Sequence, residues 1–446
     1  MDLILKEVID LASGYKNIPE KLFNKNINAI ETDSRKIQKG NLFFALKGDT
    51  FDGHDFADKT VESGAVAVVV QKILPMPIPQ IIVKDTTGFL GKLAEYYKSK
   101  FDLITIAVTG SCGKTTTKDM IHSVLKTRFN VVTNSGNLNN HIGVPLTVFK
   151  LTNDTEILLS ETGMNHAGEL KYLAKILKPD MAIITNVEPT HLEGLGSIEN
   201  IAKAKFELIA GVSKGGTAFL NWDNEYIRKQ AAGLKCEIVK YGFSKGANFT
   251  FKGYSNKNSV YTVDYNGVKI ISPLAGFHNV HNLLITCAVA EKFMIPPKDI
   301  KKALDSFEPS GRRMKIVKNK GITIIDDCYN ASPTAVLNAI KIFDDTDIKG
   351  KRYFVFGDMF ELGKFSEQYH KLVGKGIQTS KIYFTLLMGS AVKWTLKAIG
   401  KDKNVELFAE HEDIINFLKK NLKKGDGVLI KASHSMKFEK ISSSLY

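Results

Sequence analysis

Apolar and polar positions divide the chain into three segments, each predicting a mixture of helices and strands. In residues 1–101, short apolar runs stand among turn residues, as is typical of a small α/β domain. These runs are Asn41–Leu46, Ala65–Val70 and Gln80–Val83.

Residues 102–311 alternate apolar runs with amphipathic stretches. The runs Ile104–Thr109, Ile157–Ser160 and Met181–Thr185 predict buried parallel strands, each followed by a helix. Near the end of this segment, alternating patterns predict an antiparallel meander. Its strands are expected at Asn248–Phe251, Ser259–Asp264 and Val268–Ile271.

Residues 312–446 restart the strand–helix rhythm and predict a second doubly wound sheet. Its strands are expected at Ile322–Ile325, Tyr353–Phe356, Ile382–Thr385 and Val428–Lys431. Pro309 and Gly311 make Phe307–Gly311 a candidate hinge. We therefore expect an α/β protein with three domains at residues 1–101, 102–311 and 312–446. The first is a small α/β domain and the last is Rossmann-like.

Composition narrows the class of protein. The chain has 446 residues, of which 43% are hydrophobic and 24% are charged. Its apolar runs are shorter than the roughly 18 residues that a membrane span needs, and polar residues interrupt the N-terminus, so we expect no transmembrane segment or signal peptide. Four widely spaced cysteines indicate neither a disulfide framework nor a zinc site. We therefore expect a cytoplasmic protein.

The net charge raises the question of an anionic partner. With 61 Lys and Arg against 47 Asp and Glu, the formal net charge is +14. A nucleic acid and a smaller anion are both candidates. The lysines are spread along the whole chain, and no recognition helix or aromatic stacking motif is evident. We therefore expect no nucleic-acid partner.

The most informative segment is Ala107–Thr116, in which an apolar strand runs into a glycine-rich turn and then a helix. Glycines let consecutive N–H groups point at one anion, and the helix adds its N-terminal dipole. Lys114 would supply charge to the β and γ phosphates, and the Thr115 hydroxyl is a candidate Mg²⁺ ligand. Val108 stands where the general pattern has glycine, so this is a shortened P-loop. The predicted ATP contacts here are Gly110, Ser111, Cys112, Gly113, Lys114, Thr115 and Thr116.

Acidic and imidazole side chains follow the neighbouring strands. Glu161 comes at the carboxyl end of a predicted parallel strand, where open α/β sheets bind ligands, so it is a candidate Mg²⁺ ligand beside Thr115. His191 lies in the loop after the next strand. The helix expected over Ile198–Val212 carries Lys203 and Lys205, which the sequence pattern alone does not distinguish.

At this point the motifs resemble a known family along nearly the whole chain. The chain is similar to the Mur ligases, the ATP-dependent amide-bond synthetases of peptidoglycan assembly. The shared motifs include Thr32–Arg35, Gly136–Thr147, Glu161–Asn165, Ile201–Lys205, His278–Asn282, Asp326–Pro333, Gly357–Gly363 and Lys431–Met436. Three of them (GNLNNHIG, DDCYNASP and GDMFELG) point to the family member that joins D-alanyl-D-alanine to UDP-N-acetylmuramoyl-tripeptide, with ATP cleaved to ADP and phosphate.

The resemblance implies roles for individual residues. Lys205 matches a lysine that CO₂ converts to a carbamate. With His191 it would hold a second Mg²⁺, while Thr115 and Glu161 hold the first. Lys114, His191, Lys205 and Arg312 are the expected catalytic residues, with Arg312 meeting the phosphates. Asn279, Asn282 and Asp327 are expected on the adenine and ribose side of ATP. Expected substrate contacts are Ser34 and Arg35 for the UDP-sugar, and Asn139, Asn140, Tyr329 and Asn330 near the peptide and dipeptide.

The chain departs from the family pattern at several positions. Cys112 replaces a polar loop residue, and Ser332 stands where asparagine is more usual. Ala432 and His434 stand where glycine and arginine are more usual. A neutral His434 would contact a phosphate or carboxylate more weakly than arginine does.

Several alternatives stay open on sequence alone. The general base for the amine is His191, a peptide carboxylate or solvent. The third residue of the acceptor peptide is lysine or meso-diaminopimelate, and the domains rest open or closed. The resemblance implies a monomer. Rival interpretations are a sibling ligase that adds another amino acid, a nucleic-acid-stimulated P-loop ATPase, and a regulatory homologue without activity.

Overall fold

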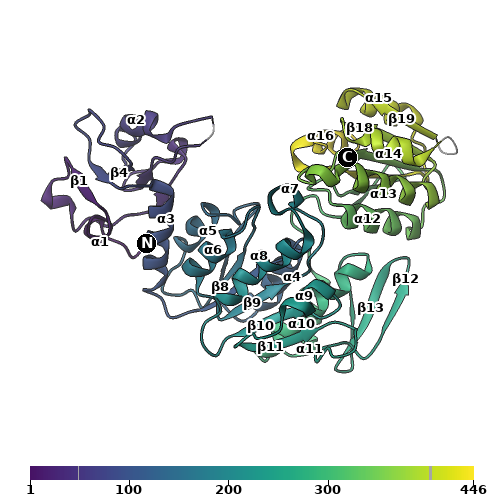
Figure 1. Ribbon diagram of the computed structural model, residues 1–446, viewed down its shortest axis with the longest axis horizontal. Helices are drawn as coiled ribbons and strands as arrows, with labels where there is room; N and C mark the ends of the chain where they lie inside the picture. The colour runs from purple at the N-terminus through teal and green to yellow at the C-terminus, as the bar shows by residue number, and fades with distance from the viewer. Residues whose placement is uncertain (49, 401–403) are drawn as a thin grey trace.

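The computed structural model describes residues 1–48, 50–400 and 404–446. Its three domains lie in a row, each around its own sheet. Figure 1 shows the purple N-terminal domain and the green-to-yellow C-terminal domain at opposite ends of the teal central domain. The α/β class and the three-domain architecture are as the sequence predicted. The boundaries near residues 101 and 311 stay predictions.

The N-terminal domain has a five-stranded sheet in the order β1-β5-β4-β3-β2. Only the β1–β5 pair is antiparallel. The strands are β1 (Gly14–Lys16), β2 (Ile30–Glu31), β3 (Leu42–Phe44), β4 (Ala67–Val70) and β5 (Gln80–Ile82). The helices are α1 (Leu5–Leu11), α2 (Ala57–Glu62) and α3 (Thr86–Lys98), with 3₁₀ turns at Glu20–Leu22, Ser34–Lys36 and Gly53–Phe56.

The central domain has a six-stranded, fully parallel sheet in the order β11-β10-β9-β6-β8-β7. Alternate residues of β6 enter different cores, because successive side chains of a strand point to opposite faces: Ile106 and Val108 in one, Ala107 in the other. Both faces are therefore covered. The strands are β6 (Ile104–Thr109), β7 (Val131–Thr133), β8 (Ile157–Glu161), β9 (Met181–Ile184), β10 (Thr217–Asn221) and β11 (Glu237–Tyr241).

The helices of this domain cover the two faces of its sheet, and α4 and α10 pack against one another. They are α4 (Lys114–Leu125), α5 (Gly143–Val148), α6 (Glu169–Leu177), α7 (Leu192–Leu195), α8 (Ile198–Ala210), α9 (Glu225–Gln230), α10 (Phe277–Lys292) and α11 (Pro297–Asp305). Strand order reverses at β6, which lies between β9 and β8. Ligands of open α/β sheets bind at such a switch point, at the carboxyl ends of the strands.

The antiparallel meander is present, but its first strand was predicted in the wrong place. It consists of β12 (Tyr254–Lys257), β13 (Val260–Tyr265) and β14 (Val268–Ile271). Asn248–Phe251 forms no strand, and only Phe249 makes an isolated bridge to Tyr241. All four residues of β12 are exposed, so the segment carries no alternation of apolar and polar positions to detect.

The C-terminal domain has a six-stranded sheet in the order β15-β16-β20-β17-β18-β19, parallel except for β15. Its strands are β15 (Lys315–Asn319), β16 (Ile322–Asp326), β17 (Arg352–Gly357), β18 (Phe384–Met388), β19 (Asn404–Phe408) and β20 (Gly427–Lys431). Its helices are α12 (Pro333–Asp345), α13 (Ser366–Thr379), α14 (Val392–Ile399), α15 (His411–Asn421) and α16 (Glu439–Ser443), with 3₁₀ turns at Gly363–Phe365 and His434–Met436.

Candidate active site

A cleft of about 940 Å³ lies between the central and C-terminal domains, at the carboxyl end of β6. Its central-domain wall includes the P-loop, the loops after β8 and β9, and the start of α10. Its C-terminal wall includes the loops after β16, β17 and β20. The motifs singled out in the two domains therefore meet in one place.

The P-loop has the backbone geometry that its glycines allow. Gly113 precedes α4 with φ of +79°, and Gly110 has φ of +153°. A Cβ atom on Gly110 would lie 1.8 Å from Oγ1 of Thr185, so no side chain fits there. Nζ of Lys114 donates to the carbonyl of Gly110 at 2.9 Å, which places the ammonium over the loop.

The loop after β9 holds the P-loop from the side. The Cys112 N–H donates to Oδ1 of Asn186 at 2.8 Å, and Oγ1 of Thr185 donates to the Cys112 carbonyl at 2.6 Å. The Cys112 thiol lies 3.3 Å from the Ser332 hydroxyl of the C-terminal domain. Burial raises the pKa of this thiol to about 12, so it is a neutral packing group.

The candidate site for the first Mg²⁺ is formed where α4 begins and β8 ends. Oγ1 of Thr115 donates to Oε2 of Glu161 at 2.6 Å, and Nδ2 of Asn139 donates to Oε1 at 2.8 Å. Asn134 bonds the backbone N–H and carbonyl of Glu161, which fixes the carboxylate. A hydroxyl and one carboxylate fit Mg²⁺, which keeps several waters and needs few protein ligands. Within residues 1–48, 50–400 and 404–446, no group of three or more His, Cys, Asp or Glu residues could hold a metal ion.

Lys205 is almost fully buried on α8, with 1% of its surface exposed. No hydrogen bond or ion pair joins its Nζ to the described residues. Burial, together with the charge of Lys114, holds the pKa of Lys205 well below its usual 10.5. Lys203, on the same helix, is exposed. Burial thus distinguishes Lys205 from Lys203, which the sequence pattern did not.

His191 lines the cleft from the N-terminus of α7. Its Nδ1 atom lies 2.5 Å from Oε2 of Glu361, in the C-terminal domain. This contact lowers the pKa of Glu361. Glu188, three residues before His191, also lines the cleft, and burial raises its pKa.

The start of α10 forms the far end of the cleft. Nδ2 of Asn282 donates to Oδ1 of Asn279 at 2.9 Å, and Oδ1 of Asn282 accepts from Oγ1 of Thr117 on α4 at 3.1 Å. Both asparagines are buried and line the cleft. They lie beside Gly113, where an added Cβ atom would be 2.9 Å from Asn282.

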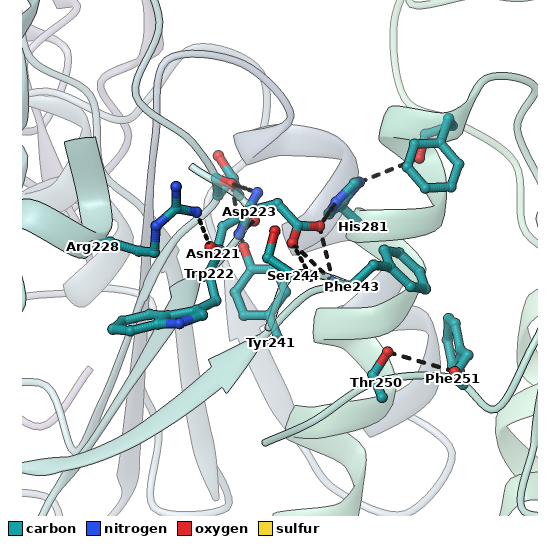
Figure 2. Close-up of polar contacts among 12 residues, drawn as sticks. Asn221, Trp222, Asp223, Arg228, Tyr241, Phe243, Ser244, Thr250, Phe251 and His281 are labelled. Atoms are coloured by element: carbon teal, nitrogen blue, oxygen red, sulfur yellow. Dashed lines mark hydrogen bonds and ion pairs between the residues drawn. The ribbon is translucent and has the colours of Figure 1, made fainter. Parts of the chain in front are cut away.

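At this end of the cleft, Asp223, which follows β10, contacts both α10 and the loop after β11. Figure 2 shows its carboxylate facing His281 of α10 and the backbone of Phe243 and Ser244. Oδ2 lies 2.7 Å from Nε2 of His281, and Oδ1 accepts from the two N–H groups at 2.9 and 2.6 Å. Burial alone would raise the pKa of Asp223, but these hydrogen bonds lower it well below its usual range.

The C-terminal wall is built on a buried ion pair. Nζ of Lys431 lies 2.5 Å from Oδ2 of Asp327 and donates to the carbonyl of Asn330 at 3.0 Å. Burial raises the pKa of Asp327, and the charge of Lys431 opposes that rise. Tyr329 lies between the guanidinium of Arg313, 3.6 Å from its ring centroid, and the ring of His434 at 5.3 Å.

Arg312 is not among the residues that line the cleft in the described structure, and its expected contact with the phosphates stays a prediction. Nη1 of Arg312 bonds Oδ2 of the fully buried Asp326 at 2.7 Å and also bonds Ser442 of α16. Arg313, the next residue, lines the cleft. The contacts of Arg312 join the start of the C-terminal domain to α16.

The remaining predicted contacts are spread over the fold. Asn140 lines the cleft, and its Oδ1 accepts from the N–H of Gly143 at the start of α5. Ser34 and Arg35 lie in the N-terminal domain, outside this cleft. Arg35 bonds both oxygens of Asp33 at 2.8 Å, which lowers the pKa of that carboxyl to about 2. Its side chain is 86% exposed.

Comparison with known proteins follows the three domains. Residues 108–290 match the Mur ligase middle domain, residues 312–434 the Mur ligase glutamate ligase domain, and residues 26–98 the Mur ligase family catalytic domain. The chain belongs to the Mur ligase family.

Individual Mur ligases match over nearly their full length. The UDP-N-acetylmuramoyl-tripeptide–D-alanyl-D-alanine ligase of Bacillus subtilis (strain 168) is 37% identical over 441 residues, covering 94% of this chain and 93% of its own. A crystal structure of MurF from Acinetobacter baumannii has a TM-score of 0.91 at 27% identity, covering 99% of this chain and 98% of its own. MurF from Thermotoga maritima in complex with ADP has a TM-score of 0.82 at 27% identity, with 94% and 96% covered.

No helix in the described part of this Mur ligase has the length and apolar character that crossing a membrane requires.

Proposed function

We propose that this Mur ligase joins D-alanyl-D-alanine to the terminal carboxylate of UDP-N-acetylmuramoyl-tripeptide, with ATP cleaved to ADP and phosphate. The full-length relative from Bacillus subtilis carries that name. The observation that carries the proposal is the cleft, in which the P-loop faces the Asp326–Pro333 and Gly357–Gly363 loops of the C-terminal domain.

The reaction requires an anionic carboxylate to attack an anionic phosphate. The tripeptide carboxylate attacks the γ-phosphorus of ATP, ADP leaves, and the amine of the dipeptide displaces phosphate from the acyl phosphate. Lys114 and Arg313 line the cleft with positive charge, which offsets repulsion between the reactants. Mg²⁺ bound at Thr115 and Glu161 would neutralise further phosphate charge. Holding the reactants in line is worth on the order of 7–11 kcal/mol for well-oriented groups.

Lys205 is the proposed site of a CO₂-derived carbamate, which with His191 would hold a second Mg²⁺. CO₂ reacts with a neutral amine, and burial favours that form of Lys205. The carbamate is a carboxylate on a long stem, which a metal ion binds and an ammonium does not. The absence of a protein partner for Nζ within the described residues leaves this position free for the modification.

The three domains suit three small-molecule substrates. Ser34 and Arg35 would contact the UDP-sugar, the P-loop with Asn279, Asn282 and Asp327 would hold ATP, and Asn139, Asn140, Tyr329 and Asn330 would border the peptide and dipeptide. Because ATP and the UDP-linked precursor are intracellular nucleotides, we place the enzyme in the cytoplasm. We expect a monomer without a nucleic-acid partner.

A panel of amine acceptors tests this function. ADP release is measured with UDP-N-acetylmuramoyl-tripeptides ending in lysine or meso-diaminopimelate and with single amino acids or D-alanyl-D-alanine as acceptor. D-Alanyl-D-alanine alone should support turnover. Turnover with a single amino acid would indicate a sibling ligase, and stimulation by DNA or RNA would indicate the rival ATPase.

A further inference from the structure

The C-terminal domain reaches the candidate second metal site through one side chain. Nδ1 of His191 is fully buried, and Oε2 of Glu361 lies 2.5 Å away. The two atoms are in close contact, although the ring nitrogen has no partner of strict hydrogen-bond geometry among the described residues. His191 belongs to the central domain, and Glu361 belongs to the GDMFELG loop. The contact therefore spans the domain junction.

The loop that carries Glu361 is held on both sides of that residue. The N–H of Phe360 donates to Oγ of Ser433 at 2.9 Å, and the N–H of Met359 donates to Nε2 of the buried His370 at 3.1 Å. Across the junction, the N–H of Glu193 donates to the Glu361 carbonyl at 3.1 Å. The carboxylate is thus presented from a supported loop.

The backbone of Glu361 adds a second observation. Its φ is +63°, a left-handed conformation that residues other than glycine seldom adopt. Such conformations persist where the surrounding structure enforces them, and they cluster at functional sites. Here the enforced conformation accompanies a side chain directed at His191.

The ring contact has a defined chemical consequence. A carboxylate at Nδ1 keeps the proton on that nitrogen and leaves the Nε2 lone pair available. Nε2 of His191 makes no hydrogen bond to the described residues. Metal-binding histidines commonly have their other nitrogen held in this way, which fixes both tautomer and ring orientation.

The geometry points to Glu361 as a positioning residue that fixes His191 for metal binding, and so makes the second metal site depend on docking of the C-terminal domain. This inference rests on the proposed function, because it assigns His191 to the metal. It goes further in naming the group that prepares the histidine and in linking domain closure to metal affinity. Lys114, whose charge also acts on Glu361, places the carboxylate within the field of the P-loop.

The test uses Glu361→Gln in the full-length chain, which keeps the size of the side chain and removes its charge. The matched control is Glu367→Gln, which removes a carboxylate of the same domain that pairs with Lys371 on α13. The first readout is ¹⁵N NMR of the His191 ring without metal at about pH 8. The signal is assigned by its loss in His191→Asn.

Wild type and Glu367→Gln should show the Nδ1-protonated tautomer, and Glu361→Gln should show a mixture. Mn²⁺ titration in the presence of ADP, followed by electron paramagnetic resonance, is the second readout. Of two bound Mn²⁺ ions, the more weakly bound one should have an affinity about 10–100-fold lower in Glu361→Gln than in wild type. Glu361→Asp, which restores the charge on a shorter stem, should recover part of this loss.

An unchanged tautomer together with unchanged Mn²⁺ affinity in Glu361→Gln would overturn the inference. So would equal losses in Glu361→Gln and Glu367→Gln, which would indicate a general weakening of the domain. Neither readout requires an acceptor substrate. A wild-type chain that shows the predicted tautomer and Mn²⁺ binding but does not ligate D-alanyl-D-alanine would contradict the proposed function alone.

Discussion

Oγ1 of Thr115 donates a 2.6 Å hydrogen bond to Oε2 of Glu161, which joins the first turn of α4 to the end of β8. The two residues are 46 positions apart in sequence, and the parallel sheet brings them together. The pairing places a hydroxyl and a carboxylate beside the P-loop lysine. That juxtaposition is the basis of the proposed first metal site.

Thr115→Val should raise the Mg²⁺ concentration needed for half-maximal turnover, because valine keeps the shape of threonine and removes the oxygen. We expect about a 10–100-fold loss of kcat/KM for MgATP. Thr127→Val is the control, because Thr127 lies just beyond the far end of α4, where its hydroxyl donates to the Val124 carbonyl. An unchanged Mg²⁺ titration in Thr115→Val would exclude this hydroxyl as a ligand.

Lys114→Ala should reduce ATP turnover to background. The side chain is the P-loop cation, and removing one group that stabilises developing charge typically costs about 10²–10³ in kcat. Lys126→Ala removes an exposed lysine just beyond the other end of α4 and should retain activity. Steady-state ADP release measures both variants. Retained turnover in Lys114→Ala would remove the P-loop assignment.

Lys205→Ala should be inactive, and a small added carboxylate should restore part of the activity by occupying the position of the carbamate. Lys203→Ala, on the same helix and exposed, should behave as wild type. Intact-protein mass spectrometry under CO₂ trapping should show the adduct in wild type and not in Lys205→Ala. A fully active Lys205→Ala would exclude the carbamate.

Substitution of Arg313 should lower activity, whereas substitution of its neighbour Arg312 should lower stability. Arg313→Ala should lower kcat with little change in unfolding temperature, because Arg313 lines the cleft. Arg312→Ala should destabilise the chain by about 1.5–3 kcal/mol, because it leaves the buried carboxylate of Asp326 without its charged donor. Thermal unfolding measures the stability of both variants, and steady-state kinetics measures their activity. The reverse pattern would return the phosphate contact to Arg312.

Asp223 should make stability depend on pH in the acid range. Its folded pKa lies below its unfolded value of 3.8, so its contribution is complete above that pH and is lost as pH falls toward the folded pKa. Asp223→Ala should cost about 1.5–3 kcal/mol at neutral pH and should flatten the stability profile below about pH 4. Denaturant unfolding across pH measures this. Parallel profiles for variant and wild type would contradict it.

The sequence predicted several elements whose patterns are strong, although the fully buried strand β10 was not predicted. The apolar run of β6 followed by the P-loop was found because a buried parallel strand and a glycine-rich turn both leave local signals. The exposed strand β12 was placed wrongly, and the edge strands β15 and β19 were not predicted. Strands that bury little on either face carry no period of apolar residues.

Site residues were predicted where a sequence motif defines their position. They were missed where only the packing of distant segments defines it. Thr115 comes shortly after the end of β6 and Glu161 ends the neighbouring strand β8, so their meeting could be anticipated from topology. The pair of Asp223 and His281 spans 58 residues and depends on how α10 packs beside β11. Whether Arg312 or Arg313 lines the cleft depends on one residue of register, which only the folded chain shows.

The most direct measurement of the central claim is phosphate release from ATP with UDP-N-acetylmuramoyl-tripeptide, with and without D-alanyl-D-alanine, with the product identified by mass. The account predicts sustained release only with both substrates, one phosphate for each UDP-N-acetylmuramoyl-pentapeptide formed, and transfer of one ¹⁸O from a labelled tripeptide carboxylate to phosphate. Phosphate release that does not depend on the dipeptide, or without pentapeptide, would contradict it.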